Sequence, residues 1–239
     1  MEREKILQHG FEQLGITLSN EQVEAFTKYY QMLVEKNKVM NLTGITEWEE
    51  VVTKHFVDSV AIVKTMDMKK DYRILDLGTG AGFPGIPLKI AFPHLEIVLL
   101  DSLNKRITWL QEVIEELGLE KITAVHGRAE DFAKDKGYRE KFDLVVSRAV
   151  ANLASLSEYC VPYVKKGGYS ISYKSGNISE ELITSEKAIK VLGGKLEHVE
   201  EFCLPGTDMS RSFVKIKKTI ETPKKYPRSD GKPTKEPIK

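Results

Sequence analysis

From residue 1 to about residue 64, apolar side chains recur at intervals of three and four, which is the spacing of amphipathic helices. The positions are Leu7, Phe11 and Leu14, then Val23, Phe26, Tyr30 and Leu33, then Val52, Phe56, Val60 and Val63. Ser19 with Gln22, and Thr46 with Glu49, fit the capping box that satisfies free amides at a helix start. The pattern predicts an N-terminal helical region with two marked helix starts.

From Tyr72 onward the pattern changes to short apolar runs bounded by turn residues, with helical stretches between them. The runs that predict strands are 73–77, 95–101, 122–125, 142–146 and 168–173, and residues 107–117 and 153–164 are expected to be intervening helices. This alternation predicts a parallel sheet with helices on both faces.

Two final apolar runs, 196–204 and 212–217, are joined by a link containing Pro205 and Gly206 that is too short for a crossover helix. They should form an antiparallel hairpin at the sheet edge. The sequence therefore predicts an α/β fold with a mostly parallel seven-stranded sheet. We expect three regions: an N-terminal helical extension (1–69), the sheet domain (70–219) and a basic, proline-rich tail (220–239).

The composition is that of a globular protein, with 41% hydrophobic and 30% charged residues in 239. No apolar run is long enough to span a bilayer, and the first residues lack the apolar stretch of a signal peptide. Two cysteines are too few for a disulfide framework. We expect a cytoplasmic protein.

Charge is unevenly distributed although the net charge is only +1. Residues 211–239 contain ten Lys or Arg against three Asp or Glu, and four prolines fall between Glu221 and Lys239. We expect this tail to lie on the surface or to be mobile, to bind a polyanion, and to contribute little to stability. The candidate residues for binding that polyanion are Lys224, Lys225, Arg228, Lys232 and Lys235.

The strongest chemical signal is a glycine-rich turn that follows the first predicted strand and precedes a helix. Gly78, Gly80 and Gly82 would let the backbone turn tightly and approach a ligand. The spacing is G-x-G-x-G, which differs from the G-x-G-x-x-G of dinucleotide sites, and Phe83 stands where that motif has its third glycine. Taken alone, the turn could equally be structural.

A carboxylate at the end of the next predicted strand strengthens the ligand interpretation. Asp101 follows Gly82 by nineteen residues, near the spacing of an acid that binds ribose hydroxyls. At the end of the third strand, Glu130 and Asp131 could meet an adenine edge, or could simply favour a helix start.

The turn and Asp101 resemble the S-adenosylmethionine site of class I, Rossmann-like methyltransferases. Further segments resemble successive blocks of one family, the bacterial 16S ribosomal RNA guanine-N7 methyltransferases of the glucose-inhibited-division B type. These segments are 37–43, 55–59, 82–88, 101–106, 127–130, 147–151 and, in outline, 226–238. The resemblance implies S-adenosylmethionine as cofactor, the small ribosomal subunit or its RNA as partner, and N7 of guanine 527 as the methylated atom.

The resemblance also implies roles for individual residues. Gly78 and Phe83, with the rest of the glycine turn, would line the methionine and ribose part of the site, and Asp101 would hold the ribose. Ala129 and Glu130 would meet the adenine. Arg148 would face the reacting end of the cofactor as a positioning residue and bind the cofactor carboxylate, guanine O6 alone or a phosphate.

The residues after the fourth predicted strand fit a reaction that needs no base. They read Ser-Arg-Ala-Val-Ala, without the Asn/Asp-Pro-Pro-aromatic turn of amino-group methyltransferases, and no Pro-Cys nucleophile occurs in the sequence. Guanine N7 carries a free lone pair and loses no proton on methylation, so alignment is the main requirement.

Two other functions remain open from the residues alone. The fold also suits an NAD-dependent oxidoreductase, although the glycine spacing disfavours it. A non-catalytic RNA-binding or ribosome-assembly protein could keep the same fold. The five histidines show no metal-ligand spacing, so we expect no metal, and His55 could pack, contact RNA or support the pocket.

Overall fold

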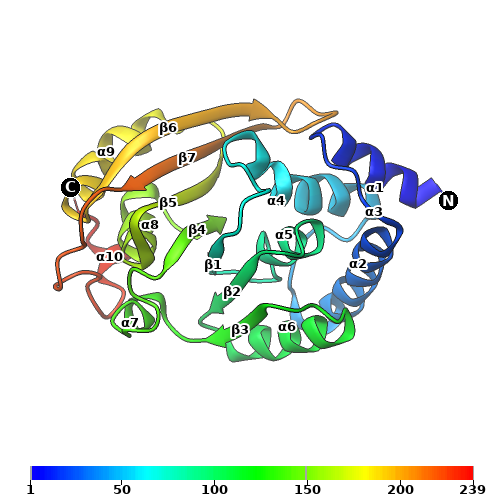
Figure 1. Ribbon diagram of the computed structural model, residues 1–239, viewed down its shortest axis with the longest axis horizontal. Coiled ribbons are helices and arrows are strands. Elements are labelled where there is room, and N and C mark those ends of the chain that lie inside the picture. The colour runs from blue at the N-terminus through cyan, green and yellow to red at the C-terminus, as the bar shows by residue number, and fades with distance from the viewer. Residues whose placement is uncertain (1, 149, 239) are drawn as a thin grey trace.

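The computed structural model, which describes residues 2–148 and 150–238, is built around one twisted seven-stranded sheet (Figure 1). The strands follow the order β3-β2-β1-β4-β5-β7-β6, and β7 runs antiparallel to both of its neighbours. Their bounds are β1 Arg73–Leu77, β2 Glu96–Asp101, β3 Ile122–His126, β4 Phe142–Arg148, β5 Val164–Ser175, β6 Gly194–Cys203 and β7 Ser210–Lys218. The expected fold, including the antiparallel hairpin, is confirmed.

Side-chain alternation along the strands divides the core between the two faces of the sheet. Ile74, Ile97 and Val146 point to the face covered by the N-terminal helices, while Leu75 and Val98 point to the opposite face. The first face carries α1 (Glu2–Glu12), α2 (Asn20–Met40), α3 (Trp48–Val51), the π-helix η1 (Val52–Val57), α4 (Asp58–Val60), the 3-10 turn η2 (Ala61–Lys64), α5 (Gly85–Ala91) and α6 (Asn104–Glu116). The second carries α7 (Ala129–Phe132), α8 (Leu153–Cys160), the 3-10 turn η3 (Val161–Tyr163) and α9 (Ser179–Val191).

The N-terminal helices share one hydrophobic core with the sheet. Phe26, Tyr29 and Phe56 are fully buried and belong to the same cluster as the strand residues of that face. The hydroxyl of Tyr29 donates a hydrogen bond of 2.5 Å to the carbonyl of Ala81, in the glycine-rich turn after β1. The helical region therefore supports the turn directly.

One of the two expected capping boxes is present. The Ser19 hydroxyl accepts from the Gln22 amide, and the Gln22 side chain accepts from the Ser19 amide. The prediction at Thr46 is wrong, because α3 begins one residue later than that box requires and Glu47 occupies the N-cap position without a side-chain bond. Helix α9, between β5 and β6, was not predicted from the sequence.

The C-terminal tail is anchored to the second face, beside α7 and α8 (Figure 1). Arg228 forms an ion pair of 2.7 Å with the fully buried Glu158, and Arg139 donates to the carbonyls of Thr222 and Tyr226. Removing the cation from a buried pair typically costs about 3 to 5 kcal/mol. The expectation that the tail contributes little to stability is therefore wrong, and deleting residues 222–239 should destabilise the fold.

The bond between Tyr29 and the glycine turn gives a prediction on stability. Tyr29→Phe leaves the buried Ala81 carbonyl without its donor and should lower the free energy of unfolding by about 1 to 3 kcal/mol. Urea denaturation measures this loss. Tyr30→Phe is the matched control, because its hydroxyl donates to the Thr46 carbonyl at a partly buried site. Equal losses in the two variants would contradict a special role for Tyr29.

Candidate active site

The turn between β1 and α5 has a backbone that only glycine adopts easily. Gly78, Gly80 and Gly82 have φ angles of +73°, +60° and +97°. The amides of Gly78 and Thr79 both donate to the carbonyl of Leu100 in β2, at 2.8 and 3.1 Å. The turn is therefore fastened to the carboxyl end of the neighbouring strand, where ligands of open α/β sheets bind.

The side chain of Asp76, near the end of β1, binds both ends of the glycine turn. Its Oδ2 atom accepts hydrogen bonds from the Thr79 hydroxyl at 2.6 Å and from the Gly85 amide at 2.8 Å. Its Oδ1 atom is buried and has no hydrogen-bond partner among the described residues. Burial raises the pKa of this carboxyl to about 7, against the lowering effect of the two hydrogen bonds.

Asp101 ties the end of β2 to the same turn. Its Oδ2 accepts from the Gly80 amide at 2.9 Å, and its Oδ1 accepts from the Leu103 amide at 2.9 Å. The guanidinium of Arg106 lies 3.4 Å from Oδ2. These contacts fix the carboxylate, which is only 4% exposed, at the edge of a cavity.

That cavity, here called the turn cavity, has a volume of about 340 Å³ and brings together several of the predicted site residues. Its lining includes Gly78 from the turn after β1, Asp101 from the end of β2, and Ala129 and Glu130 from α7. The volume lies within the usual range for small-molecule sites. A Cβ atom on Gly78 would come within 2.7 Å of Val150, which also lines the cavity, so the turn leaves no room for a side chain there.

A second cavity, of about 470 Å³, lies beside the first and shares two of its lining residues, Val150 and Ala151. We call it the arginine cavity, because Arg148 and Arg211 line it. Both arginines bind the buried Asp58: Arg148 Nη1 lies 2.8 Å from Oδ2, and Arg211 Nε lies 2.9 Å from Oδ1. Charge-assisted hydrogen bonds of this kind hold the two guanidinium groups in place.

His55 also lines the arginine cavity and lies on the π-helix η1, a rare form often found at functional sites. Its Nε2 is 2.8 Å from the Thr43 hydroxyl, and its ring stacks on Phe83 at 4.5 Å. Burial, with the nearby Arg148 charge, lowers the pKa of His55 to about 4. The imidazole is therefore neutral at neutral pH and adds no positive charge to the cavity.

Two residues of the predicted cofactor site lie behind the cavity wall. Gly82 faces Ile86 and Leu110, where a Cβ atom would collide. Phe83 is 6% exposed and packs between His55 and Tyr29, with Arg148 5.0 Å from its ring centre. Phe83 thus supports the arginine cavity through His55 and Arg148, and its contact with the cofactor stays a prediction.

The tail residues predicted to bind RNA fall into two groups. The side chains of Lys224, Lys225, Lys232 and Lys235 are exposed. Arg228 is instead committed to Glu158 and to the carbonyl of Glu236, so its predicted contact with RNA conflicts with its position. Sequence reasoning missed Asp58 and Arg211 as site residues, although Asp58 belongs to a segment that carried the family resemblance.

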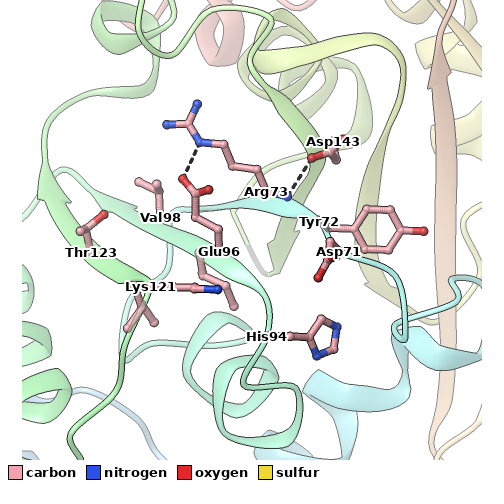
Figure 2. Close-up of a pocket in the computed structure, with 11 residues that line it drawn as sticks. Asp71, Tyr72, Arg73, His94, Glu96, Val98, Lys121, Thr123 and Asp143 are labelled. Atoms are coloured by element: carbon pink, nitrogen blue, oxygen red, sulfur yellow. Dashed lines mark hydrogen bonds and ion pairs between the residues drawn. The ribbon is translucent and has the colours of Figure 1, made fainter.

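A larger cavity, of about 720 Å³, lies at the opposite edge of the sheet (Figure 2). It is formed at the amino ends of the strands, where Arg73 pairs with Glu96 and its amide donates to Asp143. The glycine turn and Asp101 lie at the carboxyl ends of the strands, so this cavity is separate from the candidate site.

Neither a membrane span nor a metal site is found in the described residues. None of their helices is both long and apolar enough to cross a membrane. No group of three or more His, Cys, Asp or Glu among them could hold a metal ion.

The fold is shared with solved methyltransferase structures. A putative sarcosine dimethylglycine methyltransferase from Galdieria sulphuraria matches with a TM-score of 0.53 and 14% identity, over 72% of this chain and 88% of that one. Aeropyrum pernix fibrillarin, solved with S-adenosyl-L-methionine bound, matches with a TM-score of 0.51 and 16% identity, over 63% of this chain and 68% of that one. These similarities are low in sequence and show the fold alone.

Similarity in sequence is much higher to one group of proteins. The ribosomal RNA small subunit methyltransferase G of Lachnoclostridium phytofermentans is 58% identical over 96% of this chain and 95% of its own length. The protein of the same name from Alkaliphilus metalliredigens is 49% identical over the full length of both. The model of the GidB family, rRNA small subunit methyltransferase G, matches residues 22–214. The family model covers more than half of the sequence, and the two relatives are about half or more identical over nearly their full length. The chain therefore belongs to the GidB family of rRNA small subunit methyltransferases.

Proposed function

We propose that this protein transfers a methyl group from S-adenosylmethionine to N7 of a guanine in 16S ribosomal RNA. The observation that carries the proposal is the pair of cavities that adjoin at Val150 and Ala151. One suits an adenosine derivative, and the other presents arginines to an electron-rich ligand. The methyl transfer would take place where the two cavities meet.

The turn cavity would hold the cofactor. Gly78 would let the ligand approach the backbone, Asp101 would accept hydrogen bonds from the ribose hydroxyls, and Ala129 with Glu130 would border the adenine. Glu130 is 6% exposed and is already oriented by the Gly231 amide at 3.3 Å. The residues present fit the cofactor, because Gly78, Asp101, Ala129 and Glu130 together line a cavity of about 340 Å³.

When bound, S-adenosylmethionine supplies an electrophilic methyl group on sulfur, and the N7 lone pair forms the new carbon–nitrogen bond as the carbon–sulfur bond breaks. Because N7 carries no proton, the chain has no proton to remove. Its contribution is to align the base and exclude water, which can lower the barrier by several kcal/mol. Because His55 is neutral, it adds no positive charge beside a guanine that becomes positively charged on methylation.

Arg148 would position the guanine without blocking N7. Its Nη1 atom already donates to Asp58 at 2.8 Å and to the Lys54 carbonyl at 3.2 Å, and its Nη2 lies 3.4 Å from His55 Nδ1. A bidentate contact to O6 and N7 would occupy the attacking lone pair. With Nη1 held by the protein, a single contact to O6 or to a phosphate fits Arg148 best.

The exposed tail lysines would bind RNA phosphates. Lys224, Lys225, Lys232 and Lys235 keep exposed side chains while the backbone between them is anchored to the fold. Each lost phosphate contact lowers the slope of log affinity against log salt by about 0.7 to 0.9. Arg228 is left out of this set because Glu158 holds its guanidinium.

The direct test of the proposal is nucleoside mass spectrometry of 16S ribosomal RNA from cells with and without this protein. Loss of one 7-methylguanosine in the absence of the protein, and its recovery with purified protein and S-adenosylmethionine, would support it. Unchanged 7-methylguanosine would contradict it. Preferential binding of NAD would favour an oxidoreductase, and RNA binding without methyl transfer would favour an assembly protein.

Gly78→Val should abolish cofactor binding, because the new side chain collides with Val150 and the residue must keep a φ of +73°. Isothermal calorimetry with S-adenosylmethionine measures the effect. Gly118→Val is the matched control: its φ is +58°, but no atom lies within 4 Å of its added Cβ. Near-normal affinity in a folded Gly78→Val protein would remove Gly78 from the site.

Asp101→Ala should raise the Kd for S-adenosylmethionine by about one to two decades, since charge-assisted hydrogen bonds contribute roughly 1.5 to 3 kcal/mol. Asp143→Ala is a suitable control, because Asp143 also accepts a backbone hydrogen bond, from the Arg73 amide, but at the opposite edge of the sheet. If both variants weaken cofactor binding equally, the effect of Asp101 is only structural.

Asp58→Asn should lower kcat for RNA methylation by about tenfold or more and leave the Kd for S-adenosylmethionine unchanged, because Arg148 and Arg211 lose the charge that fixes them. Steady-state assays with saturating cofactor and RNA measure kcat. Glu197→Gln is the control, since Glu197 contacts Lys215 and Lys217 on the β6–β7 hairpin. A change in cofactor affinity without a change in kcat would argue against this role.

A further inference from the structure

The wall of the turn cavity includes residues from the C-terminal tail. Gly231 and Thr234 line it together with Asp101 and Glu130, although more than one hundred residues of sequence separate the two pairs. The backbone at Gly231 is left-handed, with a φ of +68°, and its amide donates to Glu130 Oε1 at 3.3 Å. The tail therefore touches the side chain that would border the adenine.

A buried ion pair holds this part of the tail in place. The Glu158 carboxylate on α8 is fully buried and accepts from the Arg228 amide at 2.8 Å, from Nε at 3.0 Å and from Nη2 at 2.7 Å. A carboxylate buried to this degree needs a paired cation. Arg228 lies only three residues before Gly231, so the pair restrains the position of the cavity wall.

Two further hydrogen bonds fix the tail on the other side of Gly231. The Ser155 hydroxyl donates to the carbonyl of Pro233 at 2.7 Å, and the hydroxyls of Tyr159 and Thr234 are 3.1 Å apart. Both partners lie on α8, the helix that carries Glu158. Tyr159 also lines the turn cavity, so α8 and the tail form one continuous wall.

We propose that residues 228–234 are a positioning element for the cofactor: Arg228, locked to Glu158, holds Gly231 and Thr234 as the wall that closes the adenine side of the turn cavity. The inference rests on the proposed function, because it takes the ligand of this cavity to be S-adenosylmethionine. It follows that cofactor binding and tail docking are coupled. The coupling must be reciprocal, so the cofactor stabilises the docked tail by the same factor by which the docked tail strengthens cofactor binding.

Hydrogen exchange on the full-length, unmodified protein tests the coupling without any risk of misfolding. Saturating S-adenosylhomocysteine should slow exchange of the amides in residues 229–236 as well as those of the glycine turn at residues 78–82. Protection of the turn alone would overturn the inference and leave the proposed cofactor site intact. Protection of neither segment would mean that the ligand does not bind here, and the proposed function itself would fail.

A variant gives the size of the coupling. Arg228→Ala should raise the Kd for S-adenosylmethionine by about tenfold, within the 5- to 150-fold range typical of coupled sites. Glu236→Ala is the matched control, since it removes an exposed tail side chain but keeps the backbone carbonyl that Arg228 contacts. Circular dichroism must show both variants folded at the assay temperature.

Thr234→Val provides a second test if Arg228→Ala does not fold. It keeps the ion pair and removes only the hydroxyl that lies 3.1 Å from the Tyr159 hydroxyl at the cavity wall. A Kd raised severalfold with an unchanged Kd for RNA supports the proposal. An unchanged cofactor Kd in both folded variants would show that the tail is a structural support only.

Discussion

The site depends on one constraint: the chain must turn sharply between β1 and α5 without a side chain at Gly78, where the Val150 side chain already packs. Three left-handed glycines meet this constraint, and the carboxylates of Asp76 and Asp101 fix the turn by accepting hydrogen bonds from the Gly85 and Gly80 amides. The rest of the protein supports these few residues. Helix α2 contributes the Tyr29 hydroxyl below the turn, and Val150 packs above Gly78.

The parts of the site whose residues lie close together in the sequence could be predicted from the sequence. The glycine turn is contiguous, and Asp101 follows it at a fixed spacing because β2 lies next to β1. Asp58 and Arg211 could not be found in this way. They are 90 and 63 residues from Arg148 along the chain, and only the tertiary placement of α4, which carries Asp58, and of β7 beside β5 brings the three charges together.

The tail shows where composition is a poor guide. Counting charges and prolines predicts a mobile, basic segment, because composition averages over positions. The structure depends instead on one pairing, between Arg228 and Glu158 on α8, a helix whose residues are all buried. The neighbouring lysines, which contribute equally to the charge count, stay exposed. Within a few residues of the tail, one basic side chain thus pairs with a buried carboxylate while its basic neighbours remain exposed.

The position of Glu158 has a consequence for how the protein forms during synthesis. Its partner Arg228 lies 70 residues later in the chain. At about 5 to 20 residues per second, that separation corresponds to roughly 4 to 14 s of translation. Until Arg228 arrives, α8 cannot bury this carboxylate as a compensated ion. The second face of the sheet therefore reaches its final packing only after Arg228 has been added to the chain, later than the synthesis of the N-terminal helices and the first five strands.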